Sequence, residues 1–292
     1  MNYLEYGDAC NPTIILLHGG GLAPWNYFEE AKLLQYRYHV VLPVIDGHSG
    51  SDKDFTTIEN NADEILSYID KNCNGKVLMI CGLSLGGQIL VDLLARRKNI
   101  CKFAIVESAL VLPMKATNAL IQPIISMCYP LIKTRWFAQA QFKALHIKGI
   151  FFEDYYRGSI AITKENLLAF MKANSDYRLK ESIKETNAAV LILVGSKESA
   201  MWFLEPWLGA ARKGYEVHYM VLRASREITL RRAVERSKLD LKTNTELVEI
   251  MWEQFCDLGK YEANVIDTTA QTVSETVQSI KAHLKSGQNR IK

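Results

Sequence analysis

A serine between two glycines is the feature that most constrains how this chain can fold. Residues 82–86 read Gly-Leu-Ser-Leu-Gly, a G-x-S-x-G pattern that directly follows the apolar stretch Val77–Cys81. An amphipathic helix is predicted immediately afterwards, from Gln88 to Arg97. The chain must then reverse from strand to helix within a few residues, and small neighbours leave room for that turn. Ser84 becomes a candidate nucleophile at a helix N-terminus, where partial positive charge stabilises an alkoxide. The alternative is an ordinary glycine-rich turn.

A second glycine-rich turn lies upstream. The apolar stretch Thr13–Leu17 is predicted to be a buried strand, and it runs straight into His-Gly-Gly-Gly at residues 18–21. Without side chains in the way, backbone N–H groups in such a turn can approach a substrate oxygen. Gly20 and Leu85 are the predicted oxyanion donors, and a plain tight turn is the alternative. Two further residues are predicted to contact the substrate: Gly21 and Leu22.

With these two turns the chain resembles the α/β-hydrolase fold, in particular its lipase- and esterase-like members. Further matching stretches are Val40–Pro43 with Asp46–Ser51, and the strands Phe103–Val106 and Ala189–Val194, so the resemblance covers about the first two-thirds of the chain. It implies a mostly parallel central sheet flanked by helices, a helical cap, and a small-molecule ester as substrate of Ser84. It also implies that Asp46 and His48 belong to a structural turn near the site and not to the catalytic triad.

The pattern of strands and helices divides the chain into segments. Strands alternate with helices from Thr13 to about Ser108, which is typical of a parallel sheet. Between Leu112 and Asn187 the pattern is helical and rich in aromatic residues. The resemblance implies a cap there that lines a water-poor pocket, and the alternative is that the aromatics form the cap's own core. The predicted segments are 1–111 (first part of the core), 112–187 (cap), 188–225 (strands completing the sheet) and 226–292 (C-terminal segment).

The predicted triad lacks one member. The resemblance implies an acid at the end of the strand that follows the cap, where Glu198 is the match and Glu107, one strand earlier, is the alternative. The base should follow the last predicted strand, Glu216–Leu222, but that loop reads Arg-Ala-Ser-Arg. His218 lies within the strand, where a buried, hydrogen-bonded histidine is expected. Without a base Ser84 has ordinary reactivity, so a hydrolase-fold protein without turnover is the alternative.

The tail of the chain resembles the C-terminal half of a small P-loop nucleoside or nucleotide kinase. In such kinases the arginines of the middle helix neutralise phosphate charge; a solvated basic helix face is the alternative. No G-x-x-x-x-G-K-[ST] phosphate loop exists in the chain. The chain therefore looks like a fusion joined near Ser199 to Arg212, with Glu216–Leu222 replacing the last core strand of the hydrolase. The stretches that carry the resemblance are Tyr219–Ser225, Arg231–Arg236, Met251–Phe255, Asn264–Thr269 and a last helix from Val273.

Composition limits the partners and cofactors. A net charge of +3 over 292 residues is too small to indicate nucleic-acid binding, and 48% hydrophobic residues are enough for a sizeable core. The six cysteines form no C-x-x-C pair and have no histidine at ligand spacing, which predicts reduced thiols, no metal site and no cofactor. No signal-peptide pattern and no apolar run of bilayer-spanning length are found, so a cytoplasmic location is expected.

Overall fold

The computed structural model describes residues 1–144, 149–193, 208–209, 211–212, 214, 216–235 and 245–291. The chain forms two compact units, Met1–Leu193 and Val194–Lys292. The first unit holds the serine turn and the glycine-rich turn, and the second holds the residues that resemble a kinase.

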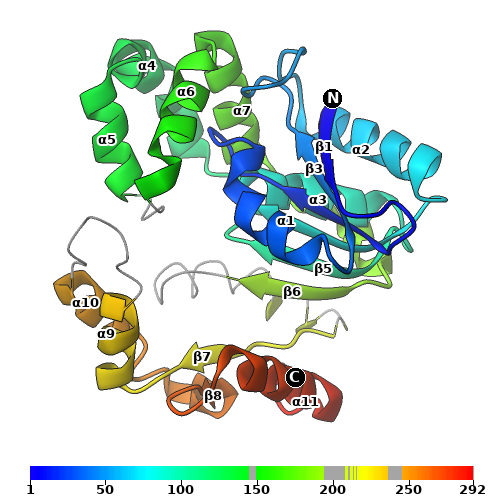
Figure 1. Ribbon diagram of the computed structural model, residues 1–292, viewed down its shortest axis with the longest axis vertical. Coiled ribbons are helices and arrows are strands. Elements are labelled where there is room, and N and C mark those ends of the chain that lie inside the picture. The colour runs from blue at the N-terminus through cyan, green and yellow to red at the C-terminus, as the bar shows by residue number, and fades with distance from the viewer. Residues whose placement is uncertain are drawn as a thin grey trace. The chain divides into compact units, whose positions relative to one another are not determined.

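A six-stranded sheet forms the centre of the first unit, in the order β1-β3-β2-β4-β5-β6 (Figure 1). β1 is antiparallel to β3, and every other neighbouring pair of strands is parallel. The carboxyl ends of the parallel strands therefore share one edge, which is where ligand sites of such sheets form. The strands are β1 (Asn2–Tyr6), β2 (Thr13–Leu17), β3 (His39–Val44), β4 (Val77–Leu83), β5 (Cys101–Glu107) and β6 (Ala189–Leu193).

Helices cover both faces of this sheet. Alternate side chains of a strand point to opposite faces, and β2 shows this directly. Ile15 and Leu17 pack in a cluster with the helices α2 (Ile58–Asn72) and α3 (Leu85–Arg96). Ile14 and Leu16 pack on the other face, with the short helix η1 (Pro24–Tyr27) and with α1 (Phe28–Leu34).

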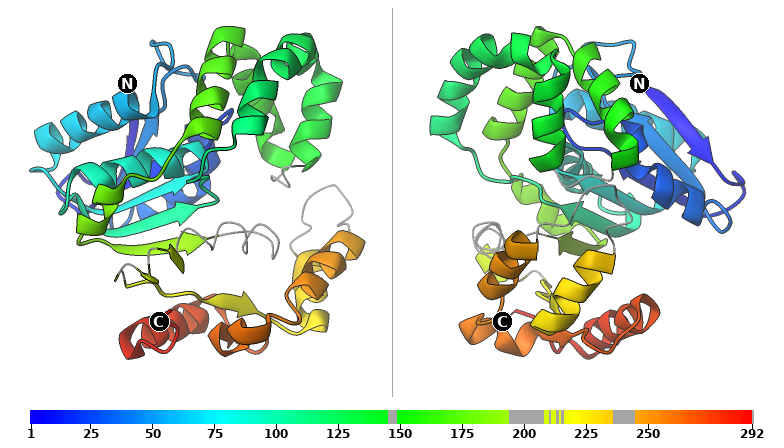
Figure 2. Two further views of the ribbon diagram at one scale, coloured as in Figure 1. Left: turned by 180° about the vertical axis from the view of Figure 1, so that it is seen from behind. Right: turned by 60° about the vertical axis from the view of Figure 1, so that its left-hand side comes forward.

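A helical region is inserted between β5 and β6, and Figure 2 shows its long helices gathered beside one end of the sheet. The sheet and this insertion have the architecture that the sequence predicted. Some of the aromatic side chains form a cluster of their own, in which Phe142 and Tyr155 pack with Trp25 from the core. The elements of the insertion are α4 (Lys115–Ile132), α5 (Arg135–Ala144), η2 (Gly149–Phe151), α6 (Phe152–Ala161) and α7 (Lys164–Asp176), followed by η3 (Glu181–Glu185).

The second unit contains a separate two-stranded parallel sheet of β7 (Val221–Arg223) and β8 (Val265–Asp267). The expectation that the strand Glu216–Leu222 continues the six-stranded sheet is therefore not met. Instead, backbone N–H and C=O groups of β7 pair with those of β8. Val221 of β7 is buried with Leu258 and Tyr261 in a small core. The remaining elements are α9 (Arg226–Glu235), α10 (Thr245–Gln254), η4 (Gly259–Asn264) and α11 (Val273–Ser286). No described helix is long and apolar enough to span a bilayer.

The N-cap of α2 contributes to the stability of the first unit. The Thr57 side chain accepts a hydrogen bond from the Asn60 N–H, whereas the neighbouring Thr56 accepts only from the Asn60 side chain. We expect Thr57→Ala to lower the free energy of unfolding by about 1 kcal/mol, because an orphan helix amide loses its partner. Thr56→Ala should change it by less than about 0.5 kcal/mol. Urea denaturation of both variants measures this, and equal effects would contradict the assignment of the cap.

Candidate active site

Ser84 lies between β4 and α3 in a backbone conformation that is rare for a residue with a side chain. Its φ is 50° and its ψ −110°, which costs on the order of 1–3 kcal/mol. Two backbone hydrogen bonds hold it: its N–H donates to the Glu107 carbonyl at 2.8 Å, and its carbonyl accepts from the Gln88 N–H at 3.0 Å. The neighbouring strand and the helix therefore fix the serine from both sides.

Two glycines make this turn possible. A Cβ on Gly82 would lie 2.3 Å from the carbonyl oxygen of Gly86, and a Cβ on Gly86 would lie 2.3 Å from that of Leu17. Any other residue would clash with backbone atoms at either position. The first turn of α3 thus lies directly against the end of β2, as the sharp strand-to-helix reversal predicted from the G-x-S-x-G pattern requires.

The glycine-rich turn after β2 lies beside the start of α3. A Cβ on Gly20 would be 3.6 Å from the Leu85 Cβ, so the two predicted oxyanion donors are neighbours. Leu85 is the first residue of α3, and its N–H has no intrahelical acceptor. The Gly21 N–H donates to a histidine ring and the Leu22 N–H to the Gly19 carbonyl. Of the amides at residues 20–22, only that of Gly20 has no hydrogen bond to the described residues, and Gly20 is exposed.

Two buried histidines hold the ends of β2 and β3 together. His48 Nε2 accepts the Gly21 N–H at 3.0 Å, and its Nδ1 lies 3.0 Å from the Asp46 carbonyl. His18 Nε2 accepts the Ile45 N–H at 3.1 Å, and its Nδ1 lies 3.0 Å from the Gly19 carbonyl. A backbone N–H can only donate and a carbonyl can only accept, so both rings carry their proton on Nδ1. The predicted structural turn at residues 46–48 is thus tied to the glycine-rich turn through His48.

Neither of these rings can act as a general base in this arrangement. Burial lowers the pKa of His48 to about 4; burial, and then the neighbouring His48, lower the pKa of His18 to about 3. Both are neutral at pH 7, and both lone pairs already accept a backbone N–H. His39 begins β3 at the opposite edge of the sheet, where it contacts Glu5 and Thr13.

Among the described residues, the other candidate triad positions do not form a hydrogen-bonded serine–histidine–acid triad. Glu198, the predicted acid, lies outside the described residues. Glu107, the alternative acid, ends β5; burial, and then the Glu30 carboxylate, raise its pKa, and no described histidine is hydrogen-bonded to it. His218 belongs to the second unit, where its Nε2 lies 2.9 Å from a Glu216 carboxylate oxygen and its Nδ1 is buried.

The helix that follows Ser84 is tied to both ends of the inserted helices. Gln88 is fully buried on α3, and its Nε2 donates to the carbonyls of Leu110 at 2.7 Å and Asn174 at 2.8 Å. The Asn174 side chain donates back to the Gln88 Oε1 at 3.0 Å. Leu110 precedes α4 and Asn174 lies near the end of α7, so one amide side chain fixes both connections of the insertion.

A side chain of the insertion also closes over the glycine-rich turn. Phe170 of α7 is 2% exposed, and its ring stacks on His48 with 4.6 Å between ring centroids. A Cβ on Gly20 would lie 3.3 Å from the same ring. Phe170 and its contacts could not be predicted from the sequence, because α7 and the glycine-rich turn are far apart in the chain. Gln88 could have been noticed as an amide on the inward side of a helix whose other buried positions, apart from Asp92, are apolar or glycine.

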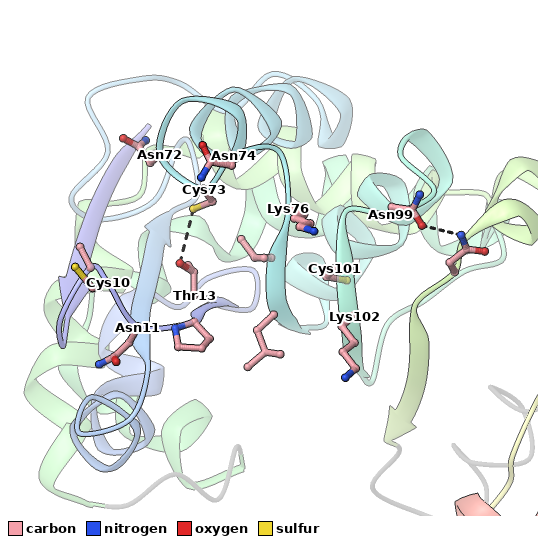
Figure 3. Close-up of a pocket in the computed structure, with 15 residues that line it drawn as sticks. Cys10, Asn11, Thr13, Asn72, Cys73, Asn74, Lys76, Asn99, Cys101 and Lys102 are labelled. Carbon is pink, nitrogen blue, oxygen red and sulfur yellow. Dashed lines mark hydrogen bonds between the residues drawn. The ribbon is translucent and has the colours of Figure 1, made fainter.

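A polar pocket of about 790 Å³ lies at the opposite edge of the sheet (Figure 3). Thr13, Val77 and Cys101 line it and begin β2, β4 and β5, so it lies at the amino ends of the strands, away from Ser84. The helix α2 ends beside it, and Lys76 and Lys102 are the charged residues that line it. Among the described residues, no group of three or more His, Cys, Asp or Glu side chains could hold a metal ion.

A sequence profile of the Alpha/beta hydrolase family matches residues 14–242. The chain belongs to the α/β-hydrolase family. Its six-stranded, mostly parallel sheet with inserted helices is the α/β-hydrolase fold that the sequence predicted. Neither the profile nor the similar proteins support a kinase-like C-terminal segment, so that resemblance stays a prediction.

Similar proteins are esterases and hydrolases. The pimeloyl-[acyl-carrier protein] methyl ester esterase of Aromatoleum aromaticum is 31% identical over 88 residues, which are 30% of this chain and 33% of that protein. The chain thus matches about a third of the length of this relative. An α/β-hydrolase family protein from Desulfitobacterium hafniense has a TM-score of 0.55 at 21% identity, over 71% of this chain and 85% of that one. A carboxylesterase of Nitrososphaera gargenis has a TM-score of 0.57 at 15% identity, over 70% and 80%.

The buried His48 predicts how stability depends on pH. Its pKa falls from 6.5 in the unfolded chain to about 4 in the folded protein, so only the unfolded chain takes up its proton between these values. The contribution of His48, about 3 kcal/mol, is complete above pH 6.5 and is lost as pH falls towards 4. We expect urea unfolding between pH 7.5 and 4.5 to show a steeper loss of stability for the wild type than for His48→Gln. Parallel curves for the two proteins would contradict the neutral, buried ring.

The contacts of Gln88 predict a local effect on the inserted helices. Gln88→Met keeps the side-chain length and removes both donated hydrogen bonds, so hydrogen exchange of the backbone amides at residues 110–112, 114 and 170–176 should accelerate about tenfold or more. Asn118→Leu is the matched control, because the Asn118 amide donates only to Lys172 and Ser175 within the insertion. It should leave exchange at residues 110–112 unchanged. The same acceleration there in both variants would show that Gln88 is not what joins the insertion to α3.

Proposed function

We propose that this α/β-hydrolase is a serine hydrolase that acts on small or medium carboxylic esters through Ser84. The observation that carries the proposal is the strained turn at Ser84, which presents the half-buried serine at the N-terminus of α3 beside Leu85 and Gly20. The Ser84 hydroxyl would attack the ester carbonyl, the alcohol would leave, and water would release the acid from the acyl-enzyme. The amides of Leu85 and Gly20 would stabilise the oxyanion. Glu198 is proposed as the triad acid.

Two further observations favour an ester as the substrate. The curated relative is named as a methyl ester esterase. In addition, a serine at the turn argues against dehalogenase or epoxide-hydrolase chemistry in this family, where an aspartate takes that position. Gly21 and Leu22 would contact the substrate through their carbon atoms, because their amides are engaged within the turn. The proposed reaction requires no metal and no cofactor.

A second candidate is a hydrolase-fold protein that binds an ester-like ligand without turnover. The neutral rings of His18 and His48 favour it, because their nitrogens are bound to backbone groups and no described histidine is free to accept the Ser84 proton at this edge of the sheet. Loss of a triad member typically removes most of the rate of a serine hydrolase and leaves the part that comes from oxyanion stabilisation and binding. The two candidate functions therefore use the same ligand site and differ in the rate of ester hydrolysis.

A nucleotide-dependent phosphotransferase is disfavoured. The chain has no phosphate loop, and the arginine side chains of α9 that could face a phosphate have partners already. Arg232 donates to the carbonyls of Thr268 and Gln271, and Arg231 lies 3.8 Å from the Glu235 carboxylate. The kinase-like segment would thus be a fragment that cannot transfer phosphate. We therefore expect that ATP does not raise the melting temperature of the protein.

The proposed nucleophile is tested with the wild type, Ser84→Ala and, as a control, Ser126→Ala on the exposed surface of α4. We expect a fluorophosphonate probe to label the wild type and the control but not Ser84→Ala, because the turn and the helix N-terminus favour the alkoxide. Hydrolysis of p-nitrophenyl butyrate should fall by at least about a hundredfold in Ser84→Ala.

The outcomes separate the two candidates. Labelling of Ser84 with release of only one equivalent of p-nitrophenol would mean acylation without turnover. If the probe does not label the wild type and all three proteins hydrolyse the ester equally, the proposal of a serine hydrolase is wrong. The second candidate, a protein that binds an ester-like ligand without turnover, would then remain.

A further inference from the structure

The first helix of the insertion exposes an apolar face. Ile121 and Ile125 of α4 are buried, but four large apolar residues on its other side are open to solvent. Their exposed fractions are 56% for Leu120, 50% for Ile124, 75% for Met127 and 38% for Leu131. We refer to these four residues as the outer stripe. Single exposed apolar residues are common on proteins, but a contiguous row marks an interaction site.

The spacing of the outer stripe makes it one continuous surface. The four residues follow one another at intervals of four, three and four positions, which brings them to one side of an α-helix. Ala116, Pro123 and Pro130 are also exposed and flank them on the helical wheel. A surface helix ordinarily carries charged or polar side chains on its outward face. Here no charged residue occurs between Lys115 and Lys133.

We propose that the outer stripe docks α4 on the surface of an uncharged phospholipid layer. A helix with an apolar face can lie in the plane of such a surface, with that face sunk into the boundary between headgroups and acyl chains. The proposal goes beyond the proposed esterase function and does not depend on turnover.

The chemistry of the outer stripe favours lipid over a protein partner. Its side chains are aliphatic or thioether, whereas the residues that dominate protein–protein binding are Trp, Tyr and Arg, with Leu under-represented.

The charges around the outer stripe favour an uncharged surface. Of the cations at its two ends, Lys115 is exposed before the stripe, the Lys133 amine is held by the carbonyls of Ile160 and Ile162, and Arg135 pairs with Glu153. Free lysines and arginines are what attract a protein segment to anionic lipids. Binding should therefore come from burial of the apolar side chains and depend little on the charge of the lipid.

The test is flotation of the full chain with phosphatidylcholine vesicles in a density gradient. We expect the wild type to float with the vesicles and Met127→Glu to lower the bound fraction at least about tenfold, because a carboxylate resists entry into the apolar layer. The control is Leu33→Glu on α1, where Leu33 is 78% exposed outside the outer stripe, and it should float like the wild type. Circular dichroism melting curves confirm that both variants fold.

Three results would overturn the proposal. The first is a wild type that does not float with phosphatidylcholine. The second is flotation that requires added phosphatidylglycerol, which would mean an electrostatic contact. The third is a dimer of the wild type in sedimentation velocity that Met127→Glu dissociates, because the outer stripe would then bind a second copy of the chain.

Discussion

The close approach of α3 to the end of β2 is the constraint on which the candidate site depends. Leu17 and Gly86 come so close that a Cβ on the glycine would lie 2.3 Å from the Leu17 carbonyl oxygen. This contact leaves the chain too few residues for a relaxed turn, so Ser84 takes a positive φ. It also places the first amide of α3 beside Gly20. The strain at the serine, the free helix N-terminus and the neighbouring glycine turn thus follow from one packing requirement.

The two buried histidines follow from the same geometry. Where β2 and β3 end, backbone N–H groups leave the sheet and need acceptors, because a buried unpaired donor costs about 1–3 kcal/mol. His48 supplies an acceptor for Gly21, and His18 supplies one for Ile45. This role requires neutral rings with fixed tautomers, whereas a general base needs a free lone pair aimed at the serine. One ring cannot do both, so neither of the two histidines that build the turn can serve as the base for Ser84.

The sequence predicted those parts of the fold that are set by local pattern. The strand Thr13–Leu17 has the predicted bounds, and the helix predicted from Gln88 to Arg97 is found at Leu85–Arg96, because turns and periodicity are read over a few residues. The pairing of β7 could not be read in this way. The backbone of a short apolar strand can pair with any parallel strand, and β8, the partner of β7, lies more than 40 residues further along the chain. Polar residues within α3 were also missed, since Asp92 is fully buried against Arg96 and Lys180.

The way α3 is held links the candidate site to the inserted helices. Gln88 follows Ser84 by one helical turn and holds the chain where it enters and leaves the insertion. The turn at Ser84 and the path of α4 are therefore attached to the same buried helix, although the insertion comes later in the chain. None of these contacts involves a general base: they consist of backbone carbonyls and the neutral amide side chains of Gln88 and Asn174. The serine turn, the glycine turn and the insertion are thus held in place by backbone geometry and neutral side chains, independently of the residues that would complete a triad.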